Sequence, residues 1–154
     1  MKKVLSITVI AALGMMMMFS SCKEETPETA PLPTSTIIGK VKADLDQTNA
    51  NPENAPAGTK IYFRINSQQL ALNPLPNYVY QTLQYETTVD ASGEYTITLP
   101  CATHQAVNVT IVPNDFRYTR ITGPSTTVDY YFQGGQQVVT IRDSETNYVD
   151  LFYN

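Results

Sequence analysis

Cys101 and His104 lie three residues apart and are the pair of side chains in this sequence most suited to chemistry. A thiol beside an imidazole can form a nucleophilic thiolate pair or supply two metal ligands. His104 is the only histidine, and a hydrolytic zinc site needs three protein ligands, commonly including two or more histidines. No serine has the sequence context of a nucleophile elbow. We therefore predict a buried thiol beside a loop histidine, no catalytic site and no cofactor.

Asp44, Asp46 and Glu53 form a second candidate site, with several asparagines between and beside them. Carboxylate and amide oxygens are hard ligands that suit calcium. The spacing is not that of an EF-hand loop. A polar surface loop with Asx turns would use the same residue types, and the sequence favours this second interpretation over a calcium site.

Tyrosine is abundant in this chain, with ten residues, and tryptophan is absent. Tyr62, Tyr78 and Tyr80 are predicted to point outward, as are Tyr130 and Tyr131. Outward aromatic rings can stack on sugars or contact a partner protein. They can equally shield sheet edges, so the pattern leaves a ligand-binding role open.

Cys22 follows a segment typical of export. Lys2 and Lys3 precede an almost wholly apolar run over residues 4–19, which is shorter than the roughly 20 residues of a membrane-spanning helix. The residues Phe19-Ser20-Ser21-Cys22 resemble the lipobox of bacterial lipoproteins, although Leu is more usual at the position of Phe19. The resemblance implies that residues 1–21 are removed as a signal peptide and that Cys22 is acylated.

The residues after Cys22 are predicted to form a spacer. Lys23, Glu24 and Glu25 resemble a short export tag that displays some Gram-negative lipoproteins on the cell-surface face of the outer membrane, or they are simply the start of a solvated linker. Residues 26–35 are rich in Pro, Thr and Glu and too poor in large apolar residues to pack. We expect a lipidated, flexible tether over residues 22–35 and one folded domain over residues 36–154.

The charge of the chain excludes some partners. The net charge is −4, and loss of Lys2 and Lys3 would leave −6. An acidic protein with scattered charges has no electrostatic footprint for nucleic acid or anionic lipid headgroups. Membrane attachment is therefore expected through the lipid alone. If Cys22 is acylated, Cys101 has no disulfide partner within the chain.

After residue 35 the hydrophobic pattern has period two, which is typical of half-buried strands. The predicted strands cover residues 36–45, 60–66, 78–89, 94–99, 106–112, 127–132, 136–142 and 148–153, and residues 69–72 could prolong the second. Asp90-Ala91-Ser92-Gly93 predicts a tight hairpin between two of these strands. Gly134-Gly135 predicts another between residues 127–132 and 136–142. The pattern indicates an all-β, antiparallel two-sheet sandwich of seven to eight strands, with a small barrel as the alternative.

Three segments resemble the carboxypeptidase regulatory-like, or transthyretin-like, β-sandwich family. They are Ile38-Gly39-Lys40-Val41, residues 55–61 (APAGTKI) and residues 88–97 (TVDASGEYTI). The resemblance covers roughly residues 36–118. It departs from the family in a longer connection over residues 67–77, in Asp115-Phe116 where the family has a Gly-Tyr pair, and in the last 30 or so residues. It implies a transthyretin-like (prealbumin-like) sandwich that serves as an accessory or binding module.

Together these features predict a lipid-anchored outer-membrane protein, displayed at the cell surface, with a non-catalytic β-sandwich for protein interaction or scaffolding. The alternative is a glycan-binding accessory lipoprotein that captures polysaccharide. The protein or glycan partner is not identified by the sequence.

Overall fold

A computed structural model describes residues 31–154 of the chain. The predicted signal peptide, the acylated Cys22 and the tag at Lys23, Glu24 and Glu25 lie outside the described residues. Within the described part, no helix has the length and apolar character needed to cross a membrane.

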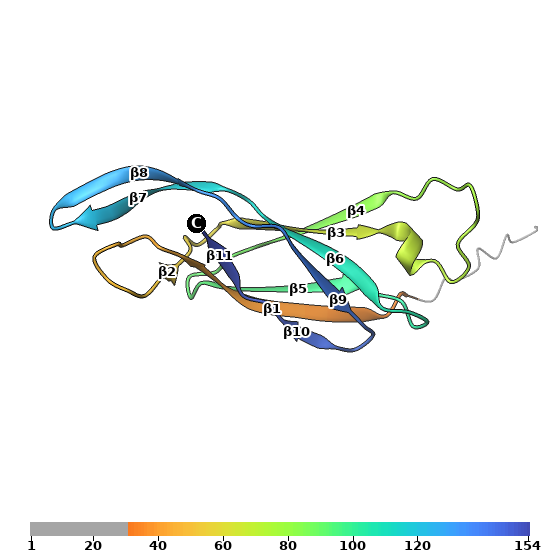
Figure 1. Cartoon of the computed structure of the whole chain (residues 1–154). Coiled ribbons are helices and arrows are strands. Elements are labelled where there is room, and N and C mark those ends of the chain that lie inside the picture. The colour runs from red at the N-terminus through yellow and green to blue at the C-terminus, as the bar shows by residue number, and fades with distance from the viewer. Residues whose placement is uncertain (1–30) are drawn as a thin grey trace, which may run out of the picture. The chain divides into compact units, whose positions relative to one another are not determined.

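The first sheet is built around β1 (Thr34–Ala43), the longest strand of the described chain (Figure 1). β5 (Glu94–Pro100) pairs with it antiparallel, and the two-residue β2 (Glu53–Asn54) continues that side. On its other side β1 pairs in parallel with β10 (Thr146–Tyr148) and then β11 (Leu151–Tyr153). The first and last strands of the domain therefore lie side by side, so that the end of the chain completes the sheet in which it began.

The second sheet is antiparallel and has the order β4-β3-β6-β9. Its strands are β3 (Lys60–Asn66), β4 (Thr82–Thr88), β6 (Val107–Pro113) and β9 (Gln137–Ile141). A separate two-stranded ribbon, β7 (Phe116–Gly123) with β8 (Thr126–Phe132), extends beyond the sandwich (Figure 1). This ribbon is called the β7–β8 hairpin below.

The core forms between the two sheets from alternate residues of their strands. β1 contributes Ile37 and Val41, and β3 contributes Ile61, Phe63 and Ile65, all fully buried. Their neighbours in sequence point outward, which is the period-two pattern of strands with one face in the core. The structure thus confirms an all-β, two-sheet sandwich, in which all strand pairs are antiparallel except those of β1 with β10 and β11. The described residues form eleven strands because several are only two to five residues long.

Several predicted boundaries were wrong. Residues 69–72 do not prolong a strand: Ser67–Leu70 form a 3₁₀ helix (η1), and the Asn66 side chain accepts a hydrogen bond from the Gln68 amide at its start. β4 begins at Thr82 rather than at residue 78, since the preceding residues belong to the connection from η1. The strand predicted over residues 148–153 is interrupted between β10 and β11.

Both predicted hairpins were also wrong in their pairing. The turn at residues 90–93 exists, with Gly93 at φ 79°, but β4 pairs with β3 and β5 pairs with β1 in the other sheet. The turn is therefore an arch that joins the two sheets. Likewise β8 pairs with β7, whereas β9 pairs with β6, so Gly134-Gly135 does not join a hairpin.

Candidate functional site

The two ends of the sandwich carry different features. At the N-terminal end the chain enters β1 at Thr34, and the Cys101 amide donates a hydrogen bond to the Pro33 carbonyl at 2.8 Å. The connections 67–81, 101–106 and 142–145 belong to this same end, as the strand registers require. At the opposite end, called the far end below, lie the loop 44–52, the turn 90–93, the β7–β8 hairpin and the last residue, Asn154 (Figure 1).

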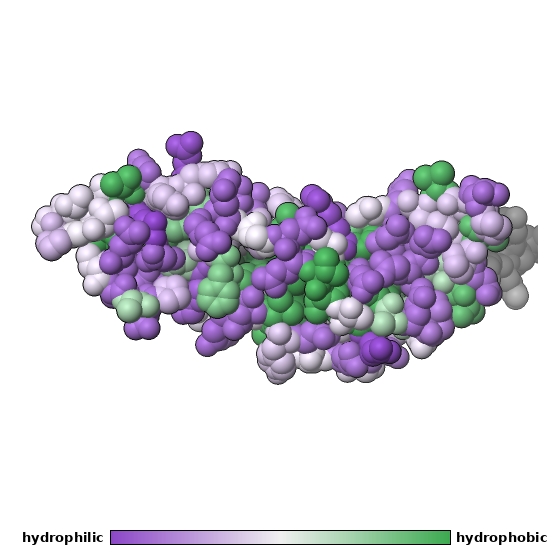
Figure 2. All heavy atoms as spheres, in the orientation of Figure 1, coloured by the Kyte–Doolittle hydropathy of each residue, from purple (hydrophilic) through white to green (hydrophobic). Residues whose placement is uncertain are grey.

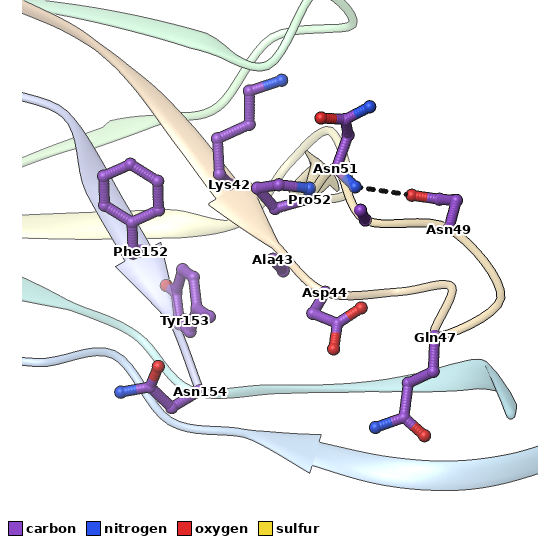
Figure 3. A pocket seen from close by; sticks show the side chains of 11 residues that line it. Lys42, Ala43, Asp44, Gln47, Asn49, Asn51, Pro52, Phe152, Tyr153 and Asn154 are labelled. Carbon is purple, nitrogen blue, oxygen red and sulfur yellow. Dashed lines mark hydrogen bonds between the residues drawn. The ribbon is translucent and has the colours of Figure 1, made fainter.

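A pocket of about 460 Å³ opens at the far end (Figure 3). The end of β1, the loop 44–52 and β11 line it. Phe152 is 56% exposed and lies beside Lys42, its register partner on β1. The loop is held in shape by Asx turns, including a hydrogen bond from the Asn51 amide to Asn49 Oδ1 at 2.9 Å. The pocket therefore combines an exposed aromatic ring with amide side chains of the loop and of Asn154.

The three candidate calcium ligands lie on or beside this loop but have separate partners. Asp44 forms an ion pair with Arg120, and Asp46 Oδ1 accepts hydrogen bonds from the Thr48 amide and hydroxyl. Glu53 accepts hydrogen bonds from the amides of Leu45 and Asp46 and from the Asn49 side chain. Among residues 31–154 no group of three acidic, histidine or cysteine side chains is placed to hold a metal ion.

These contacts set the acidity of two of the carboxyls. Hydrogen bonds from Thr48 lower the pKa of Asp46. Burial would raise the pKa of Glu53, but the hydrogen bonds from Asn49 and from the backbone outweigh it and leave that pKa lowered. Both carboxylates therefore stay ionised as hydrogen-bond acceptors that fold the loop: Asp46 forms an Asx turn with Thr48, and Glu53 bridges back to Leu45 and Asp46.

The β7–β8 hairpin adds a second exposed surface at the far end. Its exposed large side chains are Tyr118, Ile121, Val128, Tyr130 and Tyr131. The guanidinium of Arg120 lies 4.8 Å from the Tyr130 ring centroid, and that of Arg117 lies 5.9 Å from the Tyr131 centroid. Aromatic residues and arginine are the types enriched at protein interfaces.

Sequence reasoning placed Tyr130 and Tyr131 outward but missed the strand that pairs with theirs. Residues 116–123 (FRYTRITG) lack a regular alternation of apolar and polar residues, and no residue of this strand is fully buried. The signal that could have found it is the turn Gly123-Pro124-Ser125, with Ser125 at φ 60°.

The candidate aromatics Tyr62, Tyr78 and Tyr80 do not form one site. Tyr62 pairs with Glu86 on the outer face of the second sheet, where it lines a shallow pocket of about 380 Å³. Tyr78 and Tyr80 lie in the connection that leads to β4 at the N-terminal end. Their rings are in edge-to-face contact, with the centroids 4.8 Å apart. Tyr62 therefore lies on a different surface from Tyr78 and Tyr80, and the three rings cannot bind one ligand together.

Cys101 and His104 lie in different environments. Cys101 is fully buried, whereas His104 is exposed in the connection 101–106. Burial, together with the negative charges of Asp143 and Glu145, raises the pKa of the Cys101 thiol. A buried thiol with a raised pKa is a poor nucleophile. The predicted role of Cys101 as a buried thiol is supported by this placement.

The chain was compared with known families, curated proteins and solved structures. No family model and no curated protein matches it. Similar solved structures include the shaft pilin SpaA of Lactobacillus rhamnosus GG, with 14% identity and a TM-score of 0.44, over 78% of this chain and 49% of the pilin. The minor pilin GBS52 of Streptococcus agalactiae has 13% identity and a TM-score of 0.41, over 79% and 44%.

A third similar structure is a Bacteroides thetaiotaomicron VPI-5482 protein described provisionally as polysaccharide-binding (DUF1812). It has 10% identity and a TM-score of 0.37, over 77% of this chain and 47% of that one. This chain therefore spans about half the length of the solved structures that it matches.

Proposed function

We propose that the protein is a lipid-anchored, non-catalytic β-sandwich module that stands on the outer membrane and binds a partner protein with its far end. The observation that carries this proposal is that the entry of the chain and the exposed aromatic hairpin lie at opposite ends of the sandwich. The chain enters the sandwich at Thr34, twelve residues after the predicted acyl anchor at Cys22 in the sequence. The exposed aromatic hairpin and the pocket lie at the opposite end. An anchored module arranged in this way presents its binding surfaces away from the membrane.

Anchoring is tested on the native protein and on Cys22→Ser. We expect the wild-type chain to fractionate with the outer membrane and its mass to correspond to a chain that begins at an acylated Cys22. Cys22→Ser should lack the mass of the acyl chains and should no longer fractionate with the outer membrane. A wild-type mass that retains residues 1–21 with an unmodified sulfur would refute the anchor.

Surface display is tested by adding protease to intact cells. The wild-type protein should be degraded, whereas a variant with alanine at Lys23, Glu24 and Glu25 should remain acylated but become protected. Equal protection of both proteins would place the wild type on the inner face and refute the tag.

Partner binding is tested by crosslinking on intact cells. Tyr118→Ser with Tyr131→Ser removes two exposed rings of the hairpin and should reduce the captured partner at least about tenfold, as loss of interface hot spots does. Tyr148→Ser is the matched control, because Tyr148 is 80% exposed on β10, outside the hairpin. Equal capture by both variants would exclude the hairpin as the binding surface.

A second candidate function, saccharide binding, is favoured by the pocket at the far end. A sugar ring offers an apolar face that can stack on Phe152 and hydroxyls that both donate to and accept from amides such as those of Asn51 and Asn154. Calorimetry with soluble polysaccharides should then give heat that is lost in Phe152→Ala and retained in Tyr78→Ala. Absence of heat with the wild-type protein, across a panel of neutral and acidic polysaccharides, would leave the protein-binding role alone.

A further inference from the structure

The connection from η1 to β4, residues 71–81, exposes apolar side chains and carries no charge. Its four large apolar side chains are between 62% and 85% exposed: Leu72, Leu75, Tyr78 and Val79. No residue from 67 to 81 is acidic or basic. Scattered exposed hydrophobic residues are ordinary, but a contiguous exposed apolar segment marks a contact surface. In Figure 2 hydrophobic atoms are visible at the end of the molecule where Figure 1 draws this connection.

The connection is held in shape while its apolar side chains remain exposed. At its base the Ser67 amide donates to the Gln81 carbonyl at 2.9 Å, and the Gln81 amide donates to Ser67 Oγ at 3.1 Å. At its tip the Leu75 amide donates to the Tyr80 hydroxyl oxygen at 2.7 Å. Pro74 and Pro76 restrict the backbone between these contacts. A surface that is already ordered loses little entropy when it binds.

Hydrogen bonds fix this connection to the end of the sandwich at which β1 begins. Gln69, in η1 just before the connection, accepts a bond from the Gln105 side chain at 2.7 Å and another from the Asn108 amide at 2.7 Å. The same 101–106 segment is bonded to Pro33 through the Cys101 amide. The apolar connection and the entry of the chain into the sandwich therefore belong to one rigid end.

We propose that residues 71–81 insert their apolar side chains into the headgroup region of the lipid bilayer to which the chain is attached. This inference rests on the proposed acylation of Cys22. Pro31 is the ninth residue after Cys22, and a chain of that length spans at most about 30 Å. The anchor therefore keeps the N-terminal end close to the lipid, and the uncharged, apolar connection is the part of that end suited to enter it.

The composition of the connection suits a bilayer surface. Tyrosine is enriched at membrane interfaces because its ring is apolar and its hydroxyl can remain hydrated. Leu72, Leu75 and Val79 would lose contact with water, and no charged group would be desolvated with them. Contact at this end would hold the sandwich upright, with the hairpin and the far-end pocket directed away from the lipid.

The absence of tryptophan allows a direct test with one introduced reporter. The acylated full chain carrying Val79→Trp is reconstituted into phosphatidylethanolamine–phosphatidylglycerol vesicles, with and without brominated acyl chains. We expect its emission to move to shorter wavelength and to lose most of its intensity to the brominated lipid. Val138→Trp is the matched control, because Val138 is also exposed but lies on β9 towards the far end. Neither the wavelength nor the intensity of its emission should change on addition of the vesicles.

A second variant tests the same contact without a reporter. Leu75→Asp with Val79→Asp should leave the acylated protein attached to the vesicles, but the vesicles should no longer slow hydrogen exchange at the amides of residues 71–81 as they do in the wild type. If instead the wild-type chain and Cys22→Ser bind the vesicles equally weakly, the anchor itself is refuted.

Two other results would overturn the proposed insertion while the anchor stands. One is an attached Val79→Trp protein whose emission neither shifts nor is quenched. The other is the same shift produced without vesicles, either by soluble polysaccharide or by raising the protein concentration, which would assign the connection to a glycan or to a second copy of the chain.

Discussion

Gly39, on β1, lies against the short segment between β10 and β11. A Cβ placed on Gly39 would lie 1.8 Å from the Val149 carbonyl oxygen and 2.9 Å from the Tyr95 ring. That oxygen also accepts the Tyr95 hydroxyl hydrogen bond, at 2.7 Å. The glycine of the sequence segment Ile38-Gly39-Lys40-Val41 is therefore required by close approach rather than by backbone conformation, which the sequence pattern alone did not reveal.

Gly39→Ala should destabilise the domain by about 2–3 kcal/mol, as overpacking of a tight site does. The methyl group would push the segment between β10 and β11 away from β1 and strain the Tyr95 hydrogen bond. Urea unfolding followed by tyrosine fluorescence measures the change. Gly135→Ala is the control, because a Cβ there has no atom within 4 Å, and it should stay within about 0.5 kcal/mol of wild type. Equal stabilities of the two variants would contradict the close-approach role.

At the scale of elements, the sequence predicted the strands of the core but not how they pair. Alternation is a local property, so the period-two pattern of the strand predicted over residues 60–66 agrees with the burial of Ile61, Phe63 and Ile65. Pairing depends on contacts between distant segments, as in β6 with β9 or β1 with β11. A Gly-containing turn such as 90–93 fits both a hairpin within one sheet and an arch between two, and only packing of the core decides between them.

The β7–β8 hairpin escaped sequence analysis for a related reason, since only its base is buried, where Phe132 stacks on Phe116, and the rest is held to the sandwich by polar contacts. Arg120 forms an ion pair with Asp44 and stacks on Tyr130. The Ile121 amide donates to the Leu45 carbonyl at 2.9 Å, and the Gln47 amide donates to the Ile121 carbonyl at 2.8 Å. These contacts join the hairpin to the loop that lines the far-end pocket.

Arg120→Met should loosen the hairpin while the sandwich remains folded, because the substitution keeps the aliphatic stem and removes the ion pair and the stacked guanidinium. Hydrogen exchange should become faster at the amides of Ile121 and Gln47 and stay unchanged in β3 and β6. Arg117→Met is the matched control, since Arg117 stacks on Tyr131 without an ion pair among the described residues. Faster exchange throughout both sheets would show that Arg120 stabilises the whole domain instead.

At the scale of the whole molecule, the site was less predictable than the fold. The sequence identified polar loop residues and outward tyrosines. The far-end pocket, however, forms only where β1, the loop 44–52 and the last strand meet. Nothing in the sequence distinguishes Phe152 from other outward-facing residues of a strand. The end of the apolar connection 71–81 was interpreted as strand because Tyr78, Val79 and Tyr80 are of residue types enriched in strands. Its exposure follows from Pro74, Pro76 and the capping of η1 by Asn66, which end the alternation.

Two buried tyrosines predict how the stability of the whole domain responds to alkaline pH. The hydroxyl of Tyr95 donates to the Val149 carbonyl, and that of Tyr153 donates to the Asn114 carbonyl at 2.8 Å. Burial raises the pKa of both, with a smaller contribution from Asp150 for Tyr95 and from Asp115 for Tyr153. In the unfolded chain a tyrosine ionises near pH 10. The stabilising contribution is therefore fully present below pH 10 and is lost as the pH rises further, because only the unfolded chain then releases the proton.

We expect the free energy of unfolding to fall above about pH 10, with each of these tyrosines contributing up to about 1.4 kcal/mol per pH unit. Cys101, whose pKa burial also raises, adds a loss of the same sign from about pH 8.5. Tyr95→Phe isolates one group: it should cost about 1 kcal/mol at pH 7 through the lost hydrogen bond and lose less stability than wild type between pH 10 and pH 11. Urea unfolding across pH 7–11 measures both effects. Parallel pH curves for wild type and Tyr95→Phe would mean that Tyr95 ionises as readily in the folded protein as in the unfolded chain, and that its ring is not sealed between the two sheets.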